Sequence, residues 1–335
     1  MKALRLSAPG GLDKLSVTDI EDPGAPKRGE IRVRIRASSL NYHDLVVVSG
    51  RSPVADGRIP MSDGAGIVEA VGEGVNEFAP GDAVVSCFFP FWMDGEPVIA
   101  DFSQTPGDGI DGYAREVVVT PATHFTRAPK GYSHCEAATL TTAGLTAWRA
   151  LVINGGLKAG DFVLLLGTGG VSIFALQIAK AAGAICIVTS SSNEKLARAR
   201  ALGADFTINY RETENWAKAV LELTGGRGVD HVVEVGGSGT LPQSIEACRV
   251  GGHIALIGVL TGRGGEVPTG LLIRRQQRLQ GLIVGNRKRQ QDFIRALDEA
   301  HIRPVIDRIF PVDKTAEAFR YEMSGGHFGK ICLEI

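Results

Sequence analysis

The chain has 335 residues, which favours two domains, and its 36 basic side chains nearly balance its 37 acidic ones, which argues against nucleic acid or an anionic membrane as the main partner. No apolar run approaches the ~18 residues of a membrane span, and the first residues lack the apolar stretch of a secretory signal. Five cysteines without a CxxC pair predict a reducing, cytoplasmic compartment.

Residues 1–126 consist mainly of short strand patterns separated by glycine and proline. Residues 30–40 alternate apolar and polar side chains with a period of two, and similar strand patterns follow at 64–75 and 81–88. Strong helical patterns are scarce in this part of the chain. The region therefore predicts a β-rich, barrel-like domain.

A different pattern begins near residue 133, where Ser133 is a suitable N-cap for a helix over 133–152. Strand and helix patterns then alternate along the chain. The predicted strands cover 161–167, 184–190, 205–210, 229–237, 253–260 and 278–286, and the predicted helices cover 170–183, 193–203, 215–226 and 241–252. This alternation is typical of a doubly wound parallel sheet, so we predict an α/β dinucleotide-binding domain over residues 127–286.

The last segment, residues 287–335, contains a helix pattern followed by strand, helix and strand patterns. Because the parallel sheet is already complete near Val284, we expect this segment to return to the first domain. That domain then comprises residues 1–126 and 287–335.

A glycine-rich turn lies between the first strand of the predicted parallel sheet and the helix that follows it. The turn consists of Gly167, Thr168, Gly169, Gly170 and Val171. Gly167 permits the tight turn, Gly169 lets the backbone approach a pyrophosphate, and the helix N-terminus offers N–H groups to it. Ser172 stands where Gly or Ala is usual, but its side chain is small. The βαβ context favours dinucleotide binding over a plain strand–helix turn.

The second strand of this sheet ends in Ser190 and Ser191, where NAD-binding domains carry an acid for the ribose 2′-hydroxyl. Lys195 follows in the next helix, and Tyr210 ends the third strand. Hydroxyls and an ammonium suit a 2′-phosphate, so we predict NADP(H) in preference to NAD(H). Lys195 is alternatively an ordinary solvated lysine, and the missing acid is the stronger half of this argument.

With these residues in view, the chain resembles the medium-chain dehydrogenase/reductase superfamily over essentially its whole length, and within it the zinc-free quinone oxidoreductase branch. The segments that carry the resemblance are IPMSDGAGIVEAVGEGV (59–75), AGLTAW (143–148), GTGGV (167–171) and HFGKICLEI (327–335). The resemblance implies a GroES-like substrate domain, a Rossmann cofactor domain and a homodimer. An uncovered sheet edge at residues 279–284 would invite pairing with a second copy.

The resemblance also locates the metal sites of zinc-dependent members, and this chain lacks their ligands. Asn41, Ser62 and Thr142 stand where those members hold catalytic zinc with Cys, His and Cys. Amide and hydroxyl groups are poor zinc ligands beside thiolate and imidazole. The lobe that holds structural zinc, residues 87–113 here, has only Cys87. We therefore predict no zinc in either place.

Further site residues follow from the same resemblance, position by position. Those expected near the nicotinamide or its carboxamide are Thr142, Thr146, Gly258, Val259, Leu260, Val284, Gly285 and Asn286. The expected catalytic residues are Asn41, Tyr42 and His43, because donors must replace the metal in stabilising the oxyanion of the acceptor. His43 is either a proton donor or a structural histidine. Asp44 is expected to orient its neighbours and Asp63 to be structural.

Three functions are compatible with this pattern. The leading hypothesis is an NADPH-dependent reductase whose partner is a small electron-poor molecule, a quinone or an α,β-unsaturated carbonyl compound. The second is a zinc-free alcohol dehydrogenase or carbonyl reductase, for which His43 would relay a proton. The third is a cofactor-binding redox sensor with little turnover. The side chains of Phe88, Phe89, Phe91, Trp92 and Met93 either line an apolar substrate pocket or belong to the core.

Overall fold

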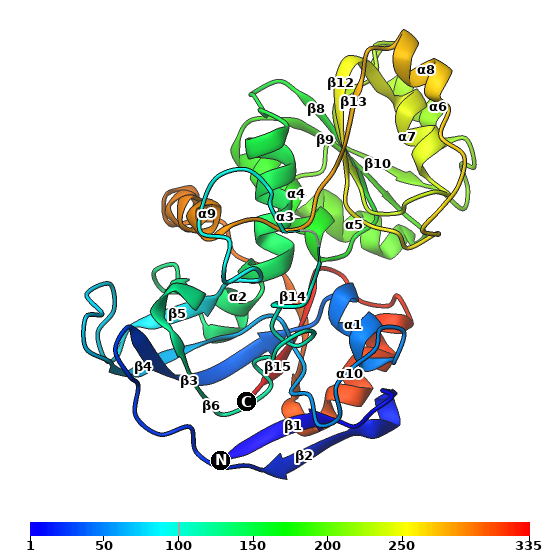
Figure 1. The fold of residues 1–335 in the computed structure, drawn as a ribbon. Helices are drawn as coiled ribbons and strands as arrows, with labels where there is room; N and C mark the ends of the chain where they lie inside the picture. Colours follow the sequence, from blue (N-terminus) through cyan, green and yellow to red (C-terminus); the bar gives the residue numbers. More distant parts are fainter. Residues whose placement is uncertain (100) are drawn as a thin grey trace. The chain divides into compact units, whose positions relative to one another are not determined.

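The computed structural model describes residues 1–99 and 101–335. These residues form two compact units (Figure 1). The β-rich unit comprises Met1–Leu145 and Val284–Ile335, and the parallel-sheet unit comprises Thr146–Ile283. The sequence placed the limits of the second unit at 127 and 286. Residues 127–145 and 284–286 lie instead in the β-rich unit, and the first helix of 127–145 packs against strands of that unit.

The parallel-sheet unit is built on six parallel strands in the order β10-β9-β8-β11-β12-β13. Their bounds are β8 Phe162–Leu166, β9 Ile185–Ser190, β10 Phe206–Asn209, β11 Val229–Glu234, β12 Cys248–Leu256 and β13 Arg278–Gly281. Counted along the chain, this is the 3-2-1-4-5-6 order of a doubly wound dinucleotide fold, which confirms the predicted fold class. The order reverses between β8 and β11, where such sheets bind their ligands.

Helices connect these strands and cover both faces of the sheet. Their bounds are α3 Leu145–Trp148, α4 Gly170–Ala181, α5 Asn193–Ala201, α6 Trp216–Leu223, α7 Leu241–Ala247 and α8 Thr269–Arg274, with a π-helical turn at Arg149–Asn154. Helices α4 and α5 lie on one face, and α6 and α7 on the other (Figure 1). Leu164 and Ile187 of the sheet pack with Val220 of α6 and Ile245 of α7 in one core. The sequence missed α8, because six residues are too few to show a helical period.

The β-rich unit contains a sheet in the order β14-β15-β3-β4-β5-β7, with β6 also paired to β3, and a separate β1–β2 pair. The bounds are β1 Lys2–Leu6, β2 Leu15–Asp19, β3 Glu30–Ser39, β4 Ala65–Val71, β5 Ala83–Ser86, β6 Val117–Pro121, β7 Phe125–Arg127, β14 Ile306–Pro311 and β15 Lys330–Glu334. Because β15 pairs with β3, the last segment of the chain completes the sheet begun by the first.

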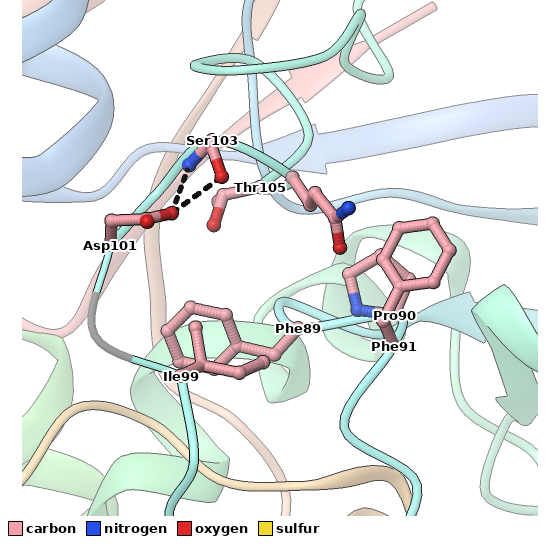
Figure 2. A pocket seen from close by; sticks show the side chains of 8 residues that line it. Phe89, Pro90, Phe91, Ile99, Asp101, Ser103 and Thr105 are labelled. Atoms are coloured by element: carbon pink, nitrogen blue, oxygen red, sulfur yellow. Dashed lines mark hydrogen bonds between the residues drawn. The ribbon is translucent and has the colours of Figure 1, made fainter.

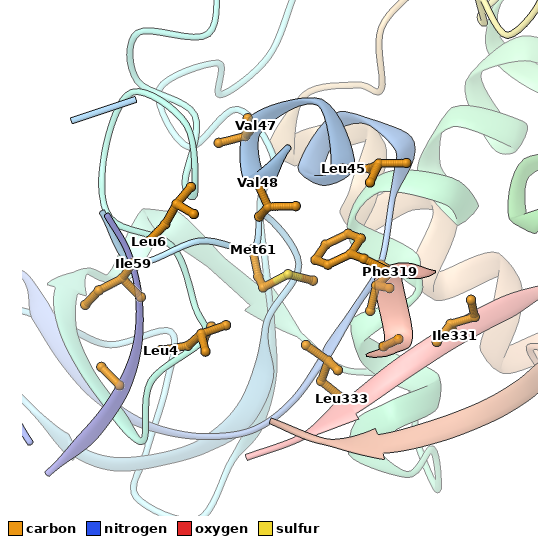
Figure 3. Packing of buried hydrophobic residues seen from close by; sticks show 14 residues of the cluster. Leu4, Leu6, Leu45, Val47, Val48, Ile59, Met61, Phe319, Ile331 and Leu333 are labelled. Carbon is orange, nitrogen blue, oxygen red and sulfur yellow. The ribbon is translucent and has the colours of Figure 1, made fainter. Parts of the chain in front are cut away.

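The helices of this unit pack against the ends of its strands. They are α1 Tyr42–Val48, α2 His134–Ala138, a π-helical turn at Leu140–Gly144, α9 Arg287–Ala300 and α10 Thr315–Met323, with short 3-10 helices at Leu12–Lys14, Ala122–His124 and Val312–Lys314. Figure 3 shows Leu45 of α1 and Phe319 of α10 in one core with Leu4, Met61 and Leu333. This core joins the start of the chain to its end.

Helix α1 is a departure from the predicted strand-rich pattern. Three consecutive valines at 46–48 favour a strand by propensity, but two of them are buried in the core as part of the helix. Tertiary packing therefore decides the conformation. The helix matters because Asn41 is its N-cap, and Tyr42 and His43 form its first turn.

The helix predicted over 133–152 is present but interrupted. Ser133 caps α2 as expected, and Glu136 completes a reciprocal capping box. Beyond α2 the chain widens into the π-helical turn that contains Thr142 before α3 begins. Such turns are rare and often occur at functional sites.

Every helix among residues 1–99 and 101–335 is too short or too polar to span a bilayer. The five cysteines are free and buried. Cys186 and Cys332 lie within β9 and β15 and act there as small core side chains.

Candidate active site

The glycine-rich turn lies at the carboxyl end of β8, beside the reversal of strand order. Gly167 has a φ of 74°, in the left-handed region that favours glycine. Gly169 has no side chain and is the N-cap of α4, so the first N–H groups of the helix are left to an anion. Ser172 donates its hydroxyl to the carbonyl of Leu166 at 2.6 Å. The departure from the usual glycine pattern therefore fastens the helix to the strand.

The residues predicted to contact the adenosine ribose lie at the ends of β9 and β10. Ser190 is buried at the last position of β9, and its hydroxyl accepts a hydrogen bond from the backbone two residues later. Ser191 and Lys195 are partly exposed, and Tyr210 is 43% exposed just beyond β10. Ser191 and Lys195 are thus accessible polar residues after β9, as are Asn193 and Glu194 between them.

The end of β11 is organised by a buried carboxylate to which the sequence analysis gave no role. Oε1 of Glu234 accepts hydrogen bonds from the N–H groups of Gly236 and Gly237 at 2.8 and 3.0 Å, and from the Thr240 hydroxyl at 2.6 Å. Oε2 accepts a hydrogen bond from the Ser244 hydroxyl. The carboxylate therefore fixes the loop between β11 and α7.

The segment after β12 lies against that loop. A Cβ on Gly258 would stand 2.0 Å from the carbonyl oxygen of Val235, so only glycine allows this approach. Val259 follows it, and Leu260 is 58% exposed. The predicted carboxamide-binding backbone is thus held at the carboxyl edge of the sheet. Thr146, predicted to lie beside the nicotinamide, is 2% exposed.

The third predicted cofactor segment, Val284, Gly285 and Asn286, is buried and belongs to the β-rich unit. Val284 has a φ of 43°, which strains a β-branched residue. Asn286 caps α9 by accepting the Arg289 N–H at 2.8 Å, and donates to the Gly95 carbonyl at 3.1 Å. Its side chain is therefore engaged within the unit, which leaves the backbone of the segment for a ligand.

A buried polar network occupies the positions where the resemblance places catalytic zinc. Asp63, at its centre, is 0% exposed. Its Oδ1 is hydrogen-bonded to the Thr142 hydroxyl at 2.6 Å. Its Oδ2 accepts hydrogen bonds from the Ser39 hydroxyl and from the Asn41 amide, the latter at 2.9 Å. Nζ of Lys330 lies 3.9 Å from the same oxygen.

The side chain of Asn41 is directed into the protein. Its Oδ1 accepts a hydrogen bond from Lys330 at 2.6 Å, and its Nδ2 donates to Asp63 and Asp44 at 2.9 and 3.1 Å. Asp44 also accepts the N–H and the hydroxyl of Ser62 at 2.8 and 3.2 Å. Asn41, expected as a donor to the substrate, is here a hub that joins one ammonium to two carboxylates.

Two acids near this ammonium have displaced pKa values. Burial raises the pKa of the Asp63 carboxyl to about 6, although Lys330 opposes the shift. Burial likewise raises the pKa of Glu322 to about 7, again against Lys330. Glu322 is partly exposed as a whole, but its Oε2 is buried and has no hydrogen-bond partner among the described residues. The network therefore holds acids that exchange protons near neutral pH.

These residues do not fit a zinc ion. Asn41, Ser62 and Thr142 offer only amide and hydroxyl groups, and their polar atoms are engaged with Asp63 and Asp44. The ammonium bound to Asn41 also places a positive charge where a dication would have to enter. Within residues 1–99 and 101–335, no three His, Cys, Asp or Glu side chains are grouped to hold a metal.

The backbone beside this network is strained. Met61 precedes Ser62 and has a φ of 78°, in the left-handed region that a residue with a Cβ rarely adopts. Gly112 lies so close that a Cβ on it would stand 2.2 Å from the Met61 carbonyl oxygen. The Ser62 N–H that follows the strained residue donates to Asp44.

Tyr42 and His43 extend from the first turn of α1. Tyr42 is 38% exposed. Nε2 of His43 lies 3.3 Å from Oδ2 of Asp108, which is ion-pair distance, although the ring is not oriented for a hydrogen bond among the described residues. The His43 ring also lies 4.4 Å from the centroid of Phe102 and 5.4 Å from that of Phe88. His43 is thus set in an aromatic cluster beside a carboxylate.

A small cavity of about 50 Å³ adjoins this cluster (Figure 2). It is lined by Phe89, Pro90, Phe91, Ile99, Asp101, Ser103, Gln104 and Thr105. Phe88, Phe89 and Trp92 are buried, whereas Phe91 and Met93 are 54% and 40% exposed. The aromatic segment therefore contributes to both core and surface. The cavity alone is too small for a quinone ring, since ligand pockets usually exceed about 300 Å³.

Lys330 was not among the predicted site residues, although its place in an apolar strand indicates that it is buried. Lys330 begins a strand whose next three residues are apolar and buried, and it is itself 4% exposed. A lysine in such a strand requires a buried anionic partner. The sequence could not identify Asp63 as that partner, because 267 positions separate the two residues in the printed chain.

Comparisons with known proteins place the chain in a family. Residues 27–130 match the alcohol dehydrogenase GroES-like domain, and residues 170–301 match the family described as zinc-binding dehydrogenase. A zinc-type alcohol dehydrogenase-like protein of Schizosaccharomyces pombe is 42% identical to this chain, over 97% of this chain and 96% of its own length.

Solved structures agree with that placement. One from Sinorhizobium meliloti 1021, named provisionally as an alcohol dehydrogenase, has a TM-score of 0.92 and 44% identity, and the match covers 99% of this chain and 98% of the other. A quinone oxidoreductase of Pseudomonas syringae has a TM-score of 0.83 and 30% identity, with 100% of this chain and 99% of the other covered.

Proposed function

Because this chain belongs to the medium-chain dehydrogenase/reductase superfamily of oxidoreductases, we propose that it is a zinc-independent reductase that prefers NADPH and delivers hydride to a quinone or an α,β-unsaturated carbonyl compound. The observation that carries the proposal is the buried ammonium of Lys330, which contacts Asn41 where zinc-dependent members bind their metal. Without a Lewis acid, an electron-poor acceptor is easier to reduce than an unactivated alcohol is to oxidise.

We assign the binding of the cofactor to residues at the carboxyl edge of the parallel sheet. The Gly167 turn and the N-terminus of α4 suit the pyrophosphate. Ser191 and Lys195 suit a 2′-phosphate, since the β9 end carries no acid at the position that selects NAD. When bound, the reduced nicotinamide supplies a hydride to the acceptor. The protein then has to position the acceptor, exclude water and provide a proton.

The second candidate function is the interconversion of a ketone and an alcohol. It is favoured by the alcohol dehydrogenase names of two relatives and by His43, whose ring lies near a carboxylate and is able to carry a proton. The two functions differ in the bond that is reduced, the C=C of an enone or its C=O.

The test is turnover by purified protein with a simple quinone, an enone and an aldehyde, each with NADPH and with NADH, and each with and without a chelator. We expect chelator-insensitive oxidation of NADPH by the quinone or the enone, with the enone carbonyl left intact. A product with the C=O reduced supports the second function. Loss of activity with chelator contradicts zinc independence, and cofactor binding without turnover favours a redox sensor.

The proposal includes a homodimer in a reducing, cytoplasmic compartment, in keeping with the free cysteines. Strand β13 is the last strand of the parallel sheet, and Ile283, just beyond it, is 48% exposed. Unpaired strand edges pair readily with a copy of themselves. Sedimentation equilibrium should give twice the mass of one chain, and a single-chain mass at micromolar concentration would contradict the dimer.

A further inference from the structure

We propose that the Thr142 hydroxyl is the catalytic acid of this site and that Asp63 is the buried carboxyl that resupplies its proton. The inference rests on the proposed reductase function and adds the source of the proton. It differs from the sequence expectation, which considered Asn41, Tyr42 and His43 as donors.

The first observation is that Thr142 connects the buried network to the surface. Of the three residues that replace zinc ligands, Asn41 is 8% exposed and Ser62 is 0% exposed, whereas Thr142 is partly exposed. The Asn41 amide also donates hydrogen bonds to Asp44 and Asp63, and the Ser62 hydroxyl donates to Asp44. Thr142 is therefore the member of the three that a substrate can reach.

The second observation is the asymmetry of the Asp63 carboxyl. The Thr142 hydroxyl donates to Oδ1 at 2.6 Å, and when Oδ1 carries a proton the same contact can run in the opposite direction, so the two oxygens are placed to exchange a proton. Oδ2 faces Ser39, Asn41 and Lys330, which are two neutral donors and a cation. These groups stabilise the negative charge that remains on Asp63 when Oδ1 loses its proton.

The proton passes from Thr142 to the reduced acceptor and from Asp63 to Thr142. Once the acceptor has taken the hydride, an electron pair on its oxygen or carbon forms a bond to the Thr142 hydroxyl hydrogen. As the O–H bond of Thr142 breaks, its oxygen takes the proton from Oδ1 of Asp63, which is left as a carboxylate. One hydride and one proton are then consumed per turnover. After product release, a proton from solvent returns to Asp63 through Thr142.

The charged groups around Asp63 are consistent with this role. Burial raises its pKa to about 6, and the shift is opposed by Lys330 on β15. Asp44 on α1 raises it, and Glu322 on α10 interacts with both Lys330 and Asp44. The thiol of Cys332 on β15 interacts electrostatically with Asp63, and it donates a hydrogen bond to the carbonyl of Cys135 on α2. A carboxyl that titrates close to the working pH is an effective proton source.

The test compares an isosteric and a conservative change of the hydroxyl. Thr142→Val should lower kcat with the enone by about 100-fold at pH 7, whereas Thr142→Ser should stay within about threefold of the wild type. Thr141→Val is the matched control, because Thr141 is buried beside Thr142 and its hydroxyl donates to the Ser86 carbonyl instead. Equal kcat values for the two valine variants would overturn the proposal.

Asp63 requires a readout that a structural role would not move. In the wild type, log kcat should fall as pH rises through about 6, because the proton source is lost; Asp63→Asn should be slow and lack this limb. The infrared difference spectrum over the same pH range should contain a protonated-carboxyl band of Asp63 that is missing from Asp63→Asn and shifted in Thr142→Val, whereas the band of Glu322, whose pKa is about 7, should remain in all three proteins. The Asp63 band is independent of turnover. If the wild type turns over no acceptor, the proposed function fails. If the Asp63 band is unaffected by Thr142→Val, the proton relay is overturned.

Discussion

Each unit of the protein buries a carboxylate completely, and the two carboxylates are surrounded differently. Glu234 in the parallel-sheet unit accepts only neutral donors, and all of them lie within ten residues of it in the chain. Asp63 in the β-rich unit is surrounded by Ser39, Asn41, Thr142 and a lysine, which come from three distant segments. Glu234 fixes one loop, whereas Asp63 joins parts of the chain that meet only in the folded state.

The comparison shows what burial alone does not decide. A buried carboxylate with neutral local donors anchors backbone, and its loss should be felt mainly in the geometry of that loop. A buried carboxylate beside an ammonium and a partly exposed hydroxyl can also store and release a proton. Substitutions in the two networks should separate these two roles.

The largest effect is expected from removal of the buried ammonium. Lys330→Met should lower the free energy of unfolding by about 3–5 kcal/mol, because Asp63 and Asn41 lose their cation in a buried site. The measurement is urea denaturation at pH 7. The double variant Lys330→Met with Asp63→Asn should be more stable than Lys330→Met alone, since the charge of Asp63 is removed together with that of Lys330. Strictly additive losses would contradict the coupling of the two residues.

The pH dependence of stability should differ between wild type and Asp63→Asn. The pKa of Asp63 is about 6 in the folded chain against an ordinary 3.8, so between these values the folded state keeps a proton that the unfolded state has lost. The contribution of Asp63 to stability therefore falls as pH rises from about 4 to 6, by about 3 kcal/mol in total. Asp63→Asn should lack this fall. Glu322 titrates in both proteins, so its contribution cancels in the difference.

The matching change at Glu234 should act on the loop instead. Glu234→Gln replaces an acceptor by a donor facing Thr240 or Ser244, and should cost about 1–3 kcal/mol of stability. Cofactor affinity should fall with it, because the loop packs against the segment at Gly258. Unchanged cofactor affinity in Glu234→Gln would mean that the loop keeps its position without the carboxylate.

The two regions differ equally in how far the sequence predicts them. In the parallel-sheet unit the first two strands, β8 and β9, are short apolar runs, and the predicted cofactor edge is made by backbone at glycine turns such as Gly167. Local sequence therefore identified both the fold and the edge. In the β-rich unit the strand order, with β15 beside β3, was not accessible from local pattern. The contact of Lys330 with Asn41 depends on that order, so the network remained unpredicted. Helix α1 was missed for a related reason, since its valines are decided by packing.

The smallest effect concerns cofactor choice at the end of β9. Ser191→Asp restores the acid that binds a ribose 2′-hydroxyl and repels a 2′-phosphate, so it should shift the ratio of kcat/KM for NADPH over NADH by about 10-fold or more towards NADH. Lys195→Ala should weaken the binding of NADPH by a smaller factor and leave the binding of NADH unchanged, because of the two cofactors NADPH alone carries a 2′-phosphate for the ammonium to contact. Both variants should keep the pH profile set by Asp63, since the change lies in the other unit. If Lys195→Ala weakens both cofactors equally, the lysine acts on the fold of α5 and the preference for NADPH rests on Ser191 alone.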